Sequence, residues 1–343
     1  MTARFPDAAV LAFAPNRVVL GVGPFTRAGH RLPDRPAFYA PDFFLDDPAP
    51  WHHPAEWREL SLDELRRQVG PERTMPALEW QAPDRAAYET TFAEIGRRLG
   101  DGTLLKAVPV VATGACLETD DPDLGPALLA RASAMPAGSA LYGLWTDGTG
   151  VVGATPEHLF RRNADGTIST IAVAGTYPPG ESDALRADPK ELAEHRSVVE
   201  DITSQLAPLG AVSTGPLDVL ELPHMTHLKT DITLTPAGVV TFEELVRTLH
   251  PTAALGLAPR DADGALRRQL LDVTGGRGRF GAPFGFEWPD GRAICLVAIR
   301  NVQWHDRQLS IVVGGGVITE SRLDREWQEL ELKQRAVRRM LGL

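Results

Sequence analysis

The sequence predicts an α+β protein with mostly antiparallel sheets, and three observations support this fold class. Strand-like apolar runs follow one another as hairpins and meanders, joined by turn signals at Asp147-Gly148, Asp165-Gly166 and 289–291. Helix-periodic segments stand between groups of strands, whereas a doubly wound parallel sheet would alternate them with single strands. The chain has 343 residues, 43% hydrophobic and 23% charged, which is the composition of a folded protein with a large core.

The first 83 residues are expected to be a short N-terminal region that forms part of the same α/β unit as the rest of the chain. They contain two strand-like runs, Val10–Phe13 and Arg17–Val22, and one helix at Ser61–Val69. Ser61 can cap this helix because Glu64 follows three residues later, which is the spacing of a capping box.

Residues 84–343 are predicted to form the main, catalytic domain, with more regular elements. Apolar residues at helical spacing and N-cap residues predict helices at Asp84–Leu99, Asp123–Ala134, Pro189–Leu206, Thr241–Leu249, Ala262–Val273 and Arg322–Leu341. Strands are expected at Leu104–Ala112, Ala140–Trp145, Val151–Ala154, His158–Arg162, Thr167–Ala174, Val219–Leu222, Leu228–Thr235, Arg292–Gln303 and Gln308–Val313. The last two should form one long hairpin, and Pro109 predicts an edge or a bulge in the first.

Charge and cysteine content exclude several functional classes. The net charge is −10, so nucleic acid and anionic membrane surfaces would be repelled, and neither is expected as a partner. A small anionic ligand would need a few well-placed cations or a metal. Cys116 and Cys295 lie in separate apolar runs and are expected to be buried free thiols of a cytoplasmic protein.

Two predicted helices carry acidic residues that could hold a divalent cation. Glu326, Glu329 and Lys333 share one face of the last helix, just after the glycine triplet 314–316, where exposed backbone N–H groups permit close approach of a ligand. A solvated charged face is the simpler explanation of this spacing.

The helix at Pro189–Leu206 offers a second acidic group. Lys190 and Glu194 lie four residues apart, with Glu191 and His195 beside them. Carboxylates from both helices could bind Mg²⁺, which prefers oxygen ligands, although an ordinary helix salt bridge also explains the pair. Zinc is rejected because no His or Cys stands at matching spacing.

Three charged residues at strand ends are candidates for substrate chemistry. Lys106 could act as a base if desolvation or a nearby cation lowers its pKa. Glu157 follows the turn at Gly153–Pro156, which would orient its side chain. The alternative for both Lys106 and Glu157 is a position at an exposed strand end without a role in chemistry. Arg300 ends an apolar strand, where a substrate carboxylate would be a bidentate partner.

Eight segments resemble the chorismate-utilising enzymes, which comprise isochorismate synthase, salicylate synthase and the first components of anthranilate synthase and aminodeoxychorismate synthase. The segments lie in the family's order at Val152–Glu157, Ile171–Thr176, Lys190–His195, Thr226–Leu228, Leu249–Thr252, Val297–Arg300, Gly314–Gly316 and Glu326–Lys333. The resemblance covers roughly residues 84–341. It implies the family's fold, in which large antiparallel sheets pack face to face with helices outside.

The resemblance also implies roles for individual residues. Glu194 and Glu329 match the ligands of Mg²⁺, which would also hold the ring carboxylate of chorismate. Lys106 matches the base that activates water for attack at C2, and Glu157 matches the acid that protonates the departing C4 hydroxyl. The implied substrate-binding residues are His227, Ala254, Leu255, Arg300, Gly314, Gly315, Gly316 and Lys333. The implied supporting residues are Lys190, Glu191, Glu326, Gly175 and Thr176.

The residues at two positions favour a Mg²⁺-dependent isochorismate synthase. Ammonia-using relatives typically carry Gln where Lys106 stands, and salicylate synthases tend to carry Thr where Ala254 stands. The segments 107–111, 176–180 and 256–258 depart from the family pattern. Salicylate synthase, an aminating enzyme of the anthranilate or aminodeoxychorismate type, and a non-catalytic chorismate-binding homologue therefore remain alternatives.

The resemblance finally leads to expectations about the setting of the enzyme. We expect a cytoplasmic monomer or homodimer that acts in siderophore, menaquinone or antibiotic biosynthesis. A glutamine amidotransferase subunit is not expected, because water rather than ammonia is the expected nucleophile.

Overall fold

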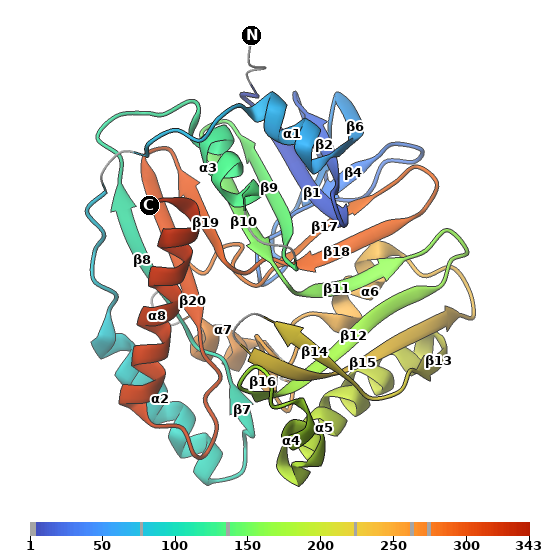
Figure 1. Ribbon diagram of the computed structural model, residues 1–343, viewed down its shortest axis with the longest axis vertical. Coiled ribbons are helices and arrows are strands. Elements are labelled where there is room, and N and C mark those ends of the chain that lie inside the picture. Colours follow the sequence, from blue (N-terminus) through green and yellow to red (C-terminus); the bar gives the residue numbers. More distant parts are fainter. Residues whose placement is uncertain (1–4, 76–77, 135–137, 223–224, 261–263, 273–275) are drawn as a thin grey trace. The chain divides into compact units, whose positions relative to one another are not determined.

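The structure is a computed structural model, and it describes residues 5–75, 78–134, 138–222, 225–260, 264–272 and 276–343. The chain divides into two compact units (Figure 1). The first unit comprises residues 1–157, 251–284 and 297–343, and the second comprises residues 158–250 and 285–296. Antiparallel sheets and helices make up both units, so the predicted α+β class is confirmed.

An eight-stranded antiparallel sheet is the centre of the first unit, with the strand order β6-β2-β1-β9-β10-β19-β20-β8. The strands are β1 (Ala8–Ala14), β2 (Arg17–Val22), β6 (Glu56–Ser61), β8 (Val110–Cys116), β9 (Ala140–Thr146), β10 (Thr149–Thr155), β19 (Asn301–His305) and β20 (Gln308–Gly314). Shorter strands pair elsewhere in this unit: β4 (Ala37–Tyr39) with β5 (Trp51–His53), β5 with β3 (Thr26–Ala28), and β7 (Lys106–Ala107) with β16 (Leu257–Ala258).

The helices of the first unit are α1 (Leu62–Val69), α2 (Arg85–Gly100), α3 (Leu124–Ser133), α7 (Ala265–Leu271) and α8 (Leu323–Leu341). Helix α1 contacts β2 and β6, and α2 packs on α8. Helix α3 contacts β9 and β10, and α8 contacts β19 and β20 (Figure 1). Helix α8 buries an apolar stripe made of Trp327, Leu330, Val337 and Leu341. Its charged face is therefore left for other contacts.

The second unit is built on a long twisted sheet with the order β13-β15-β12-β11-β18-β17. Its strands are β11 (His158–Arg162), β12 (Ile168–Tyr177), β13 (Gly210–Thr214), β15 (Met225–Pro236), β17 (Pro283–Glu287) and β18 (Ala293–Val297), and β14 (Asp218–Leu222) also pairs with β15. The helices are α4 (Ser182–Ala187), α5 (Pro189–Leu206) and α6 (Phe242–Leu249), with a short 3₁₀ turn at Ala207–Leu209. Helix α5 packs on β12 and β15.

Helix starts follow the predicted capping residues. The side chain of Ser61 accepts the N–H of Glu64 while Glu64 accepts the N–H of Ser61, and Thr241 and Glu244 repeat the arrangement at α6. Helix α5 spans the predicted residues, with Pro189 in its first turn. These signals are local, so the sequence alone sufficed to find them. For α7, the predicted ends at 262–263 and 273 lie outside the described residues.

Two predicted strands and one cysteine differ from expectation. The strand expected at Leu104–Ala112 is divided into β7 and β8 around Pro109, which lacks an N–H for a ladder hydrogen bond. The strand expected at Arg292–Gln303 is divided into β18 and β19 by a bend. Cys295 is buried as predicted, but Cys116 is exposed at the end of β8, so that prediction was wrong.

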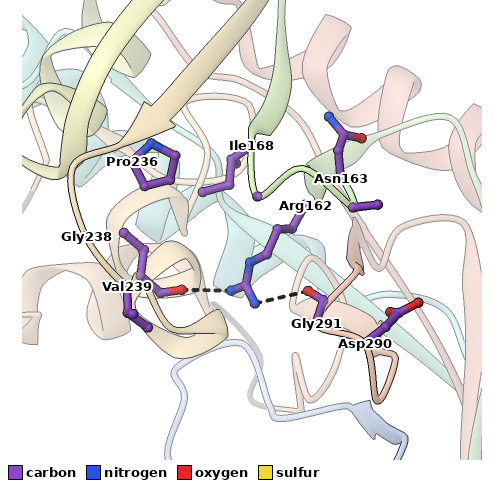
Figure 2. Close-up of a pocket in the computed structure, with 11 residues that line it drawn as sticks. Arg162, Asn163, Ile168, Pro236, Gly238, Val239, Asp290 and Gly291 are labelled. Carbon is purple, nitrogen blue, oxygen red and sulfur yellow. Dashed lines mark hydrogen bonds between the residues drawn. The ribbon is translucent and has the colours of Figure 1, made fainter.

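A cavity of about 230 Å³ lies among three turns of the second unit (Figure 2). Arg162 reaches between two of its walls and donates to the carbonyl oxygens of Val240, at 3.0 Å, and Gly291, at 3.3 Å. Its guanidinium also lies 3.6 Å from the carboxylate of Glu287. These contacts occupy the guanidinium, and we interpret Arg162 as a brace between turns. None of the predicted site residues lines this cavity.

No helix in the described ranges is both long and apolar enough to cross a membrane.

Gly96 offers a simple test of helix packing. It lies inside α2, and a β-carbon placed on it would have no described atom within 4 Å. We expect Gly96→Ala to raise the free energy of unfolding by about 0.5–1 kcal/mol, because alanine loses less backbone entropy on folding. Urea unfolding measures the effect. Gly125→Ala in α3 is the contrasting variant, because its β-carbon would lie 2.6 Å from the Trp145 ring, and it should destabilise the protein.

Candidate active site

A carboxyl group just after β10 is the centre of a charged cluster in the first unit. The backbone N–H of Glu157 donates to the hydroxyl of Thr155 at 3.1 Å, and its carbonyl accepts the N–H of Val297 at 3.0 Å. The Thr252 hydroxyl donates to Glu157 Oε1 at 3.2 Å. The turn at Gly153–Pro156 and two distant segments thus fix the direction of this side chain.

Electrostatics prepare Glu157 to carry a proton. Desolvation raises the pKa of its carboxyl group, while the Thr252 hydrogen bond and the positive charges of Lys106 and Arg300 oppose the rise. The net shift is upward, so the group stays protonated at higher pH than an ordinary glutamate. A general acid at neutral pH needs this property.

Lys106 comes to the cluster on the short strand β7, where it pairs with Ala258 of β16. Its side chain is half-buried and lies against the glycine loop that follows β20. A β-carbon on Gly316 would be 3.0 Å from Lys106 Cε and 3.7 Å from Nζ. Glycine at this position therefore leaves room for the amine.

Arg300 lies on the bend between β18 and β19 and is exposed. Desolvation lowers the pKa of its guanidinium, and the charge of Glu157 opposes this change. The structure thus brings together three predicted site residues, Lys106, Glu157 and Arg300, that are far apart in sequence.

The charged face of α8 meets the same glycine loop. Lys333 Nζ lies 2.7 Å from Glu329 Oε1 and donates to the carbonyl oxygen of Gly314 at 2.8 Å. A β-carbon on Gly315 would be 3.6 Å from Glu326 Oε2. Desolvation and the charge of Glu329 raise the pKa of Glu326, against the opposing effects of Ser321 and Lys333.

A second group of predicted residues gathers in the second unit around a bulge in β12. Gly175 sits at the bulge with φ +77°, and its carbonyl oxygen lies 3.1 Å from His227 Nδ1. A β-carbon there would be 3.3 Å from Glu191 Cβ. The backbone of Thr176 pairs with His227, while the Thr176 side chain lies outside the described parts.

Helix α5 presents its polar residues differently from expectation. Glu194 and Lys190 are exposed, and Lys190 pairs with Glu191 at 3.5 Å in place of the expected Glu194. His195 is buried, and its Nε2 lies 2.8 Å from the Thr230 hydroxyl. This contact gives His195 a structural role.

The donors on α8 fit a hard divalent cation. Glu326 and Glu329 are carboxylates, the class of ligand that Mg²⁺ prefers, and a nearby cation would favour the charged form of Glu326, whose pKa is raised by desolvation and by the charge of Glu329. Within the described ranges, no three His, Cys, Asp or Glu residues converge on one metal position. The second predicted ligand, Glu194, belongs to the second unit, so a shared site with Glu329 stays a prediction.

Sequence reasoning missed two residues around the predicted substrate segment 252–255. Thr252 belongs to the family-like segment Leu249–Thr252 without a predicted role, yet it is the hydrogen-bond partner of Glu157. Arg277 is buried and donates to the carbonyl of Leu255 at 3.2 Å and of Leu271 at 2.9 Å. No local pattern marks either role, because Glu157 is distant in sequence from Thr252, and Leu255 from Arg277. Ala254 is exposed beside the buried Leu255.

Comparison with known proteins places these residues in a family context. A model of the chorismate binding enzyme family matches residues 43–339. Isochorismate synthase MenF of Escherichia coli is 28% identical over 281 residues, covering 76% of this chain and 61% of that protein. Anthranilate synthase component 1 of Pseudomonas aeruginosa is 28% identical over 205 residues, covering 56% of this chain and 41% of that protein. The matched regions thus span between 41% and 61% of these curated relatives.

Solved structures share the fold over nearly the whole chain. The structure of E. coli MenF superposes with a TM-score of 0.80, covering 98% of this chain and 89% of that one, at 21% identity. A protein described as the 2,3-dihydroxybenzoate-specific isochorismate synthase DhbC of Bacillus anthracis gives a TM-score of 0.78 at 21% identity, covering 99% and 98% of the two chains. The fold implied by the resemblance is confirmed. Because the family model extends over most of the sequence, the chain belongs to the chorismate binding enzymes.

Proposed function

We propose that the protein is a Mg²⁺-dependent isochorismate synthase that converts chorismate to isochorismate. The observation that carries this proposal is the charged cluster in the first unit, where Lys106 and Glu157 act on one another electrostatically and desolvation raises the pKa of Glu157. A water-adding reaction on a hydroxylated ring needs one base and one acid, and this pair supplies both.

The proposed reaction exchanges one hydroxyl group for another. Lys106 in its neutral form removes a proton from water as the oxygen attacks C2. The two ring double bonds shift, and the C4 hydroxyl leaves as water with the proton from Glu157. One water enters and one departs, so the product is an isomer of the substrate. Arg300 and the backbone at Gly314–Gly316 would hold the side-chain carboxylate.

Glu329 and Glu194 would hold Mg²⁺, which when bound supplies positive charge at the ring carboxylate. The charge around the metal would be set by Glu326, Lys333, Lys190 and Glu191. The substrate site would be lined by His227 and Gly175. The proposal includes action in the cytoplasm, without an amidotransferase subunit.

An aminating reaction is the second candidate. The similarity to anthranilate synthase component 1 favours it, since the sequence identity equals that to MenF. Lys106 opposes it, because a lysine base suits attack by water. The departures at 107–111 and 256–258 keep a salicylate synthase or a non-catalytic chorismate binder as further outcomes of the test.

Product identification separates these candidates. Purified protein is incubated with chorismate and Mg²⁺, with and without an ammonium salt, and the products are identified by mass spectrometry. Isochorismate without pyruvate is the expected result. Salicylate with pyruvate would indicate the bifunctional enzyme, and a product that forms only with ammonium would indicate amination. Calorimetric binding of chorismate without any product would identify a binding protein.

The proposed role of Glu194 as a magnesium ligand can be tested against another glutamate of the same helix. We expect Glu194→Gln to weaken Mg²⁺ binding at least about tenfold, because even partners outside the ligand shell contribute that much. Magnesium titration by calorimetry in the presence of chorismate measures the change. Glu200→Gln is the control, since Glu200 is another exposed carboxylate of α5. Equal magnesium affinities in the two variants would exclude Glu194 as a ligand.

A further inference from the structure

The bend that separates β18 from β19 has an unusual backbone. Arg300 adopts φ +55°, in the left-handed region that non-glycine side chains rarely occupy. The N–H of Ile299 donates back to the carbonyl of Val297 at 2.9 Å, so the chain turns within a few residues. Such a conformation persists only where surrounding contacts determine it.

Two buried polar side chains supply those contacts. The Tyr142 hydroxyl donates to the carbonyl oxygen of Ile299 at 2.9 Å. The Asn301 side-chain amide donates to the Tyr142 oxygen at 2.8 Å and to the Ala298 carbonyl at 2.8 Å. Both side chains are completely buried. Because buried polar groups are costly without partners, these hydrogen bonds favour one shape of the bend.

Gly153, in the segment that leads to Glu157, makes room for the bend and its two hydrogen-bonding side chains. A β-carbon on Gly153 would lie 2.7 Å from the Arg300 carbonyl oxygen, 2.7 Å from the Tyr142 hydroxyl and 2.8 Å from Asn301 Cβ. The N–H of Ala154 also donates to the Arg300 carbonyl at 3.3 Å. The backbone of Arg300 is therefore fixed to the same strand that positions the candidate acid.

We propose that Tyr142 and Asn301 are positioning residues for substrate binding, whose buried hydrogen bonds hold the bend that presents Arg300 to a substrate carboxylate. This inference rests on the proposed function only in assigning a carboxylate to Arg300. Neither residue touches the substrate itself; each acts through the backbone conformation of Arg300.

Removing one hydroxyl group tests the proposal. Tyr142→Phe keeps the ring packing and deletes the hydrogen bond to Ile299. We expect the KM for chorismate to rise roughly tenfold while kcat changes much less, which is the effect of losing about one oriented hydrogen bond. Tyr88→Phe is the matched control. Tyr88 is equally buried, and its hydroxyl has no hydrogen-bond partner in the described part of the chain, so KM should stay unchanged.

A double-mutant cycle separates positioning from general damage. In an Arg300→Met background, adding Tyr142→Phe should leave KM unchanged, because the group being positioned is gone. A rise of the same size in both backgrounds would mean that Tyr142 only stabilises the fold, and would overturn the proposal. An unchanged KM in Tyr142→Phe alone would overturn it as well.

A second variant and a binding measurement complete the test. Asn301→Ala removes the two donated hydrogen bonds and should reproduce the KM change, and thermal unfolding shows whether each variant is folded. If Arg300→Met binds chorismate as tightly as the wild type by calorimetry, the role of Arg300 is wrong and the proposal falls with it. Formation of a different product from chorismate would overturn the proposed reaction and leave the positioning test intact.

Discussion

Replacing Lys106 by alanine is expected to lower kcat by a factor of roughly 10²–10⁴, because the variant lacks the amine that we propose as the base for the attacking water. Chorismate binding should change little, since Arg300 and the glycine loop are retained. Steady-state kinetics give the rate, and calorimetry gives the affinity. The adjacent Gly316 would have more free space in this variant, so no clash should disturb the fold.

Two further lysine variants make the Lys106 result specific. Lys106→Arg keeps the positive charge but cannot lose a proton at neutral pH, so it should be as inactive as the alanine variant. Lys229→Ala is the control, because Lys229 pairs with Asp231 on β15, outside the cluster, and its kcat should match the wild type. A normal rate in Lys106→Arg would show that charge alone is required and that the base lies elsewhere.

Acid is expected to destabilise the protein strongly through His52. This histidine on β5 is 2% exposed, and neither ring nitrogen has a hydrogen-bond partner within the described residues. Burial lowers its pKa to about 3, and the charges of Arg279, Arg27 and His53 act in the same direction. The folded protein therefore holds this imidazole neutral.

The sign of the pH effect follows from which state binds the proton. In the unfolded chain the His52 pKa is 6.5, so between pH 6.5 and about 3 only the unfolded state is protonated at this site. This group should reduce the free energy of unfolding by about 1.4 kcal/mol for each unit of acidification, and by about 5 kcal/mol in total. Above pH 6.5 it should have no effect.

Urea unfolding at several pH values measures this contribution. His52→Phe keeps an aromatic ring beside Phe25, whose ring centroid lies 6.2 Å from that of His52, and should lose the part of the pH dependence between 6.5 and 3 that His52 contributes. His305→Phe is the control, since the His305 side chain is 77% exposed, and it should follow the wild-type curve. If His52→Phe also follows that curve, protonation of His52 does not oppose folding.

Features that depend on local sequence could be predicted closely. The capping boxes at Ser61 and Thr241 and the extent of α5 follow from residues within one or two turns of each other. The division of the segment at 292–303 could not be predicted in this way. Its apolar run extends past the end of β18 to Ile299 inside the bend, and the bend depends on Tyr142, which is distant in sequence.

The candidate site shows the same limit. Lys106, Glu157 and Arg300 could be singled out because charged residues at strand ends are conspicuous, and the fold brings them together. Thr252 hydrogen-bonds to Glu157, and Asn301 hydrogen-bonds to Tyr142. Each partner is distant in sequence, so no sequence pattern links the two residues of either pair. The exposed Cys116 was mistaken for a core residue because a strand end shares the apolar character of the strand interior.

The position of β1 and β2 in the sheet of the first unit affects where the start of this domain should be drawn in the sequence. The family model begins to match at residue 43, whereas these two strands end at residue 22, yet β1 lies between β2 and β9 in the sheet. A protein trimmed to the matched region would leave β9 with an unpaired edge, which is a template for aggregation. A segment that the family model does not match thus supplies two interior strands of the sheet, and expression boundaries drawn from that model alone would cut through the core.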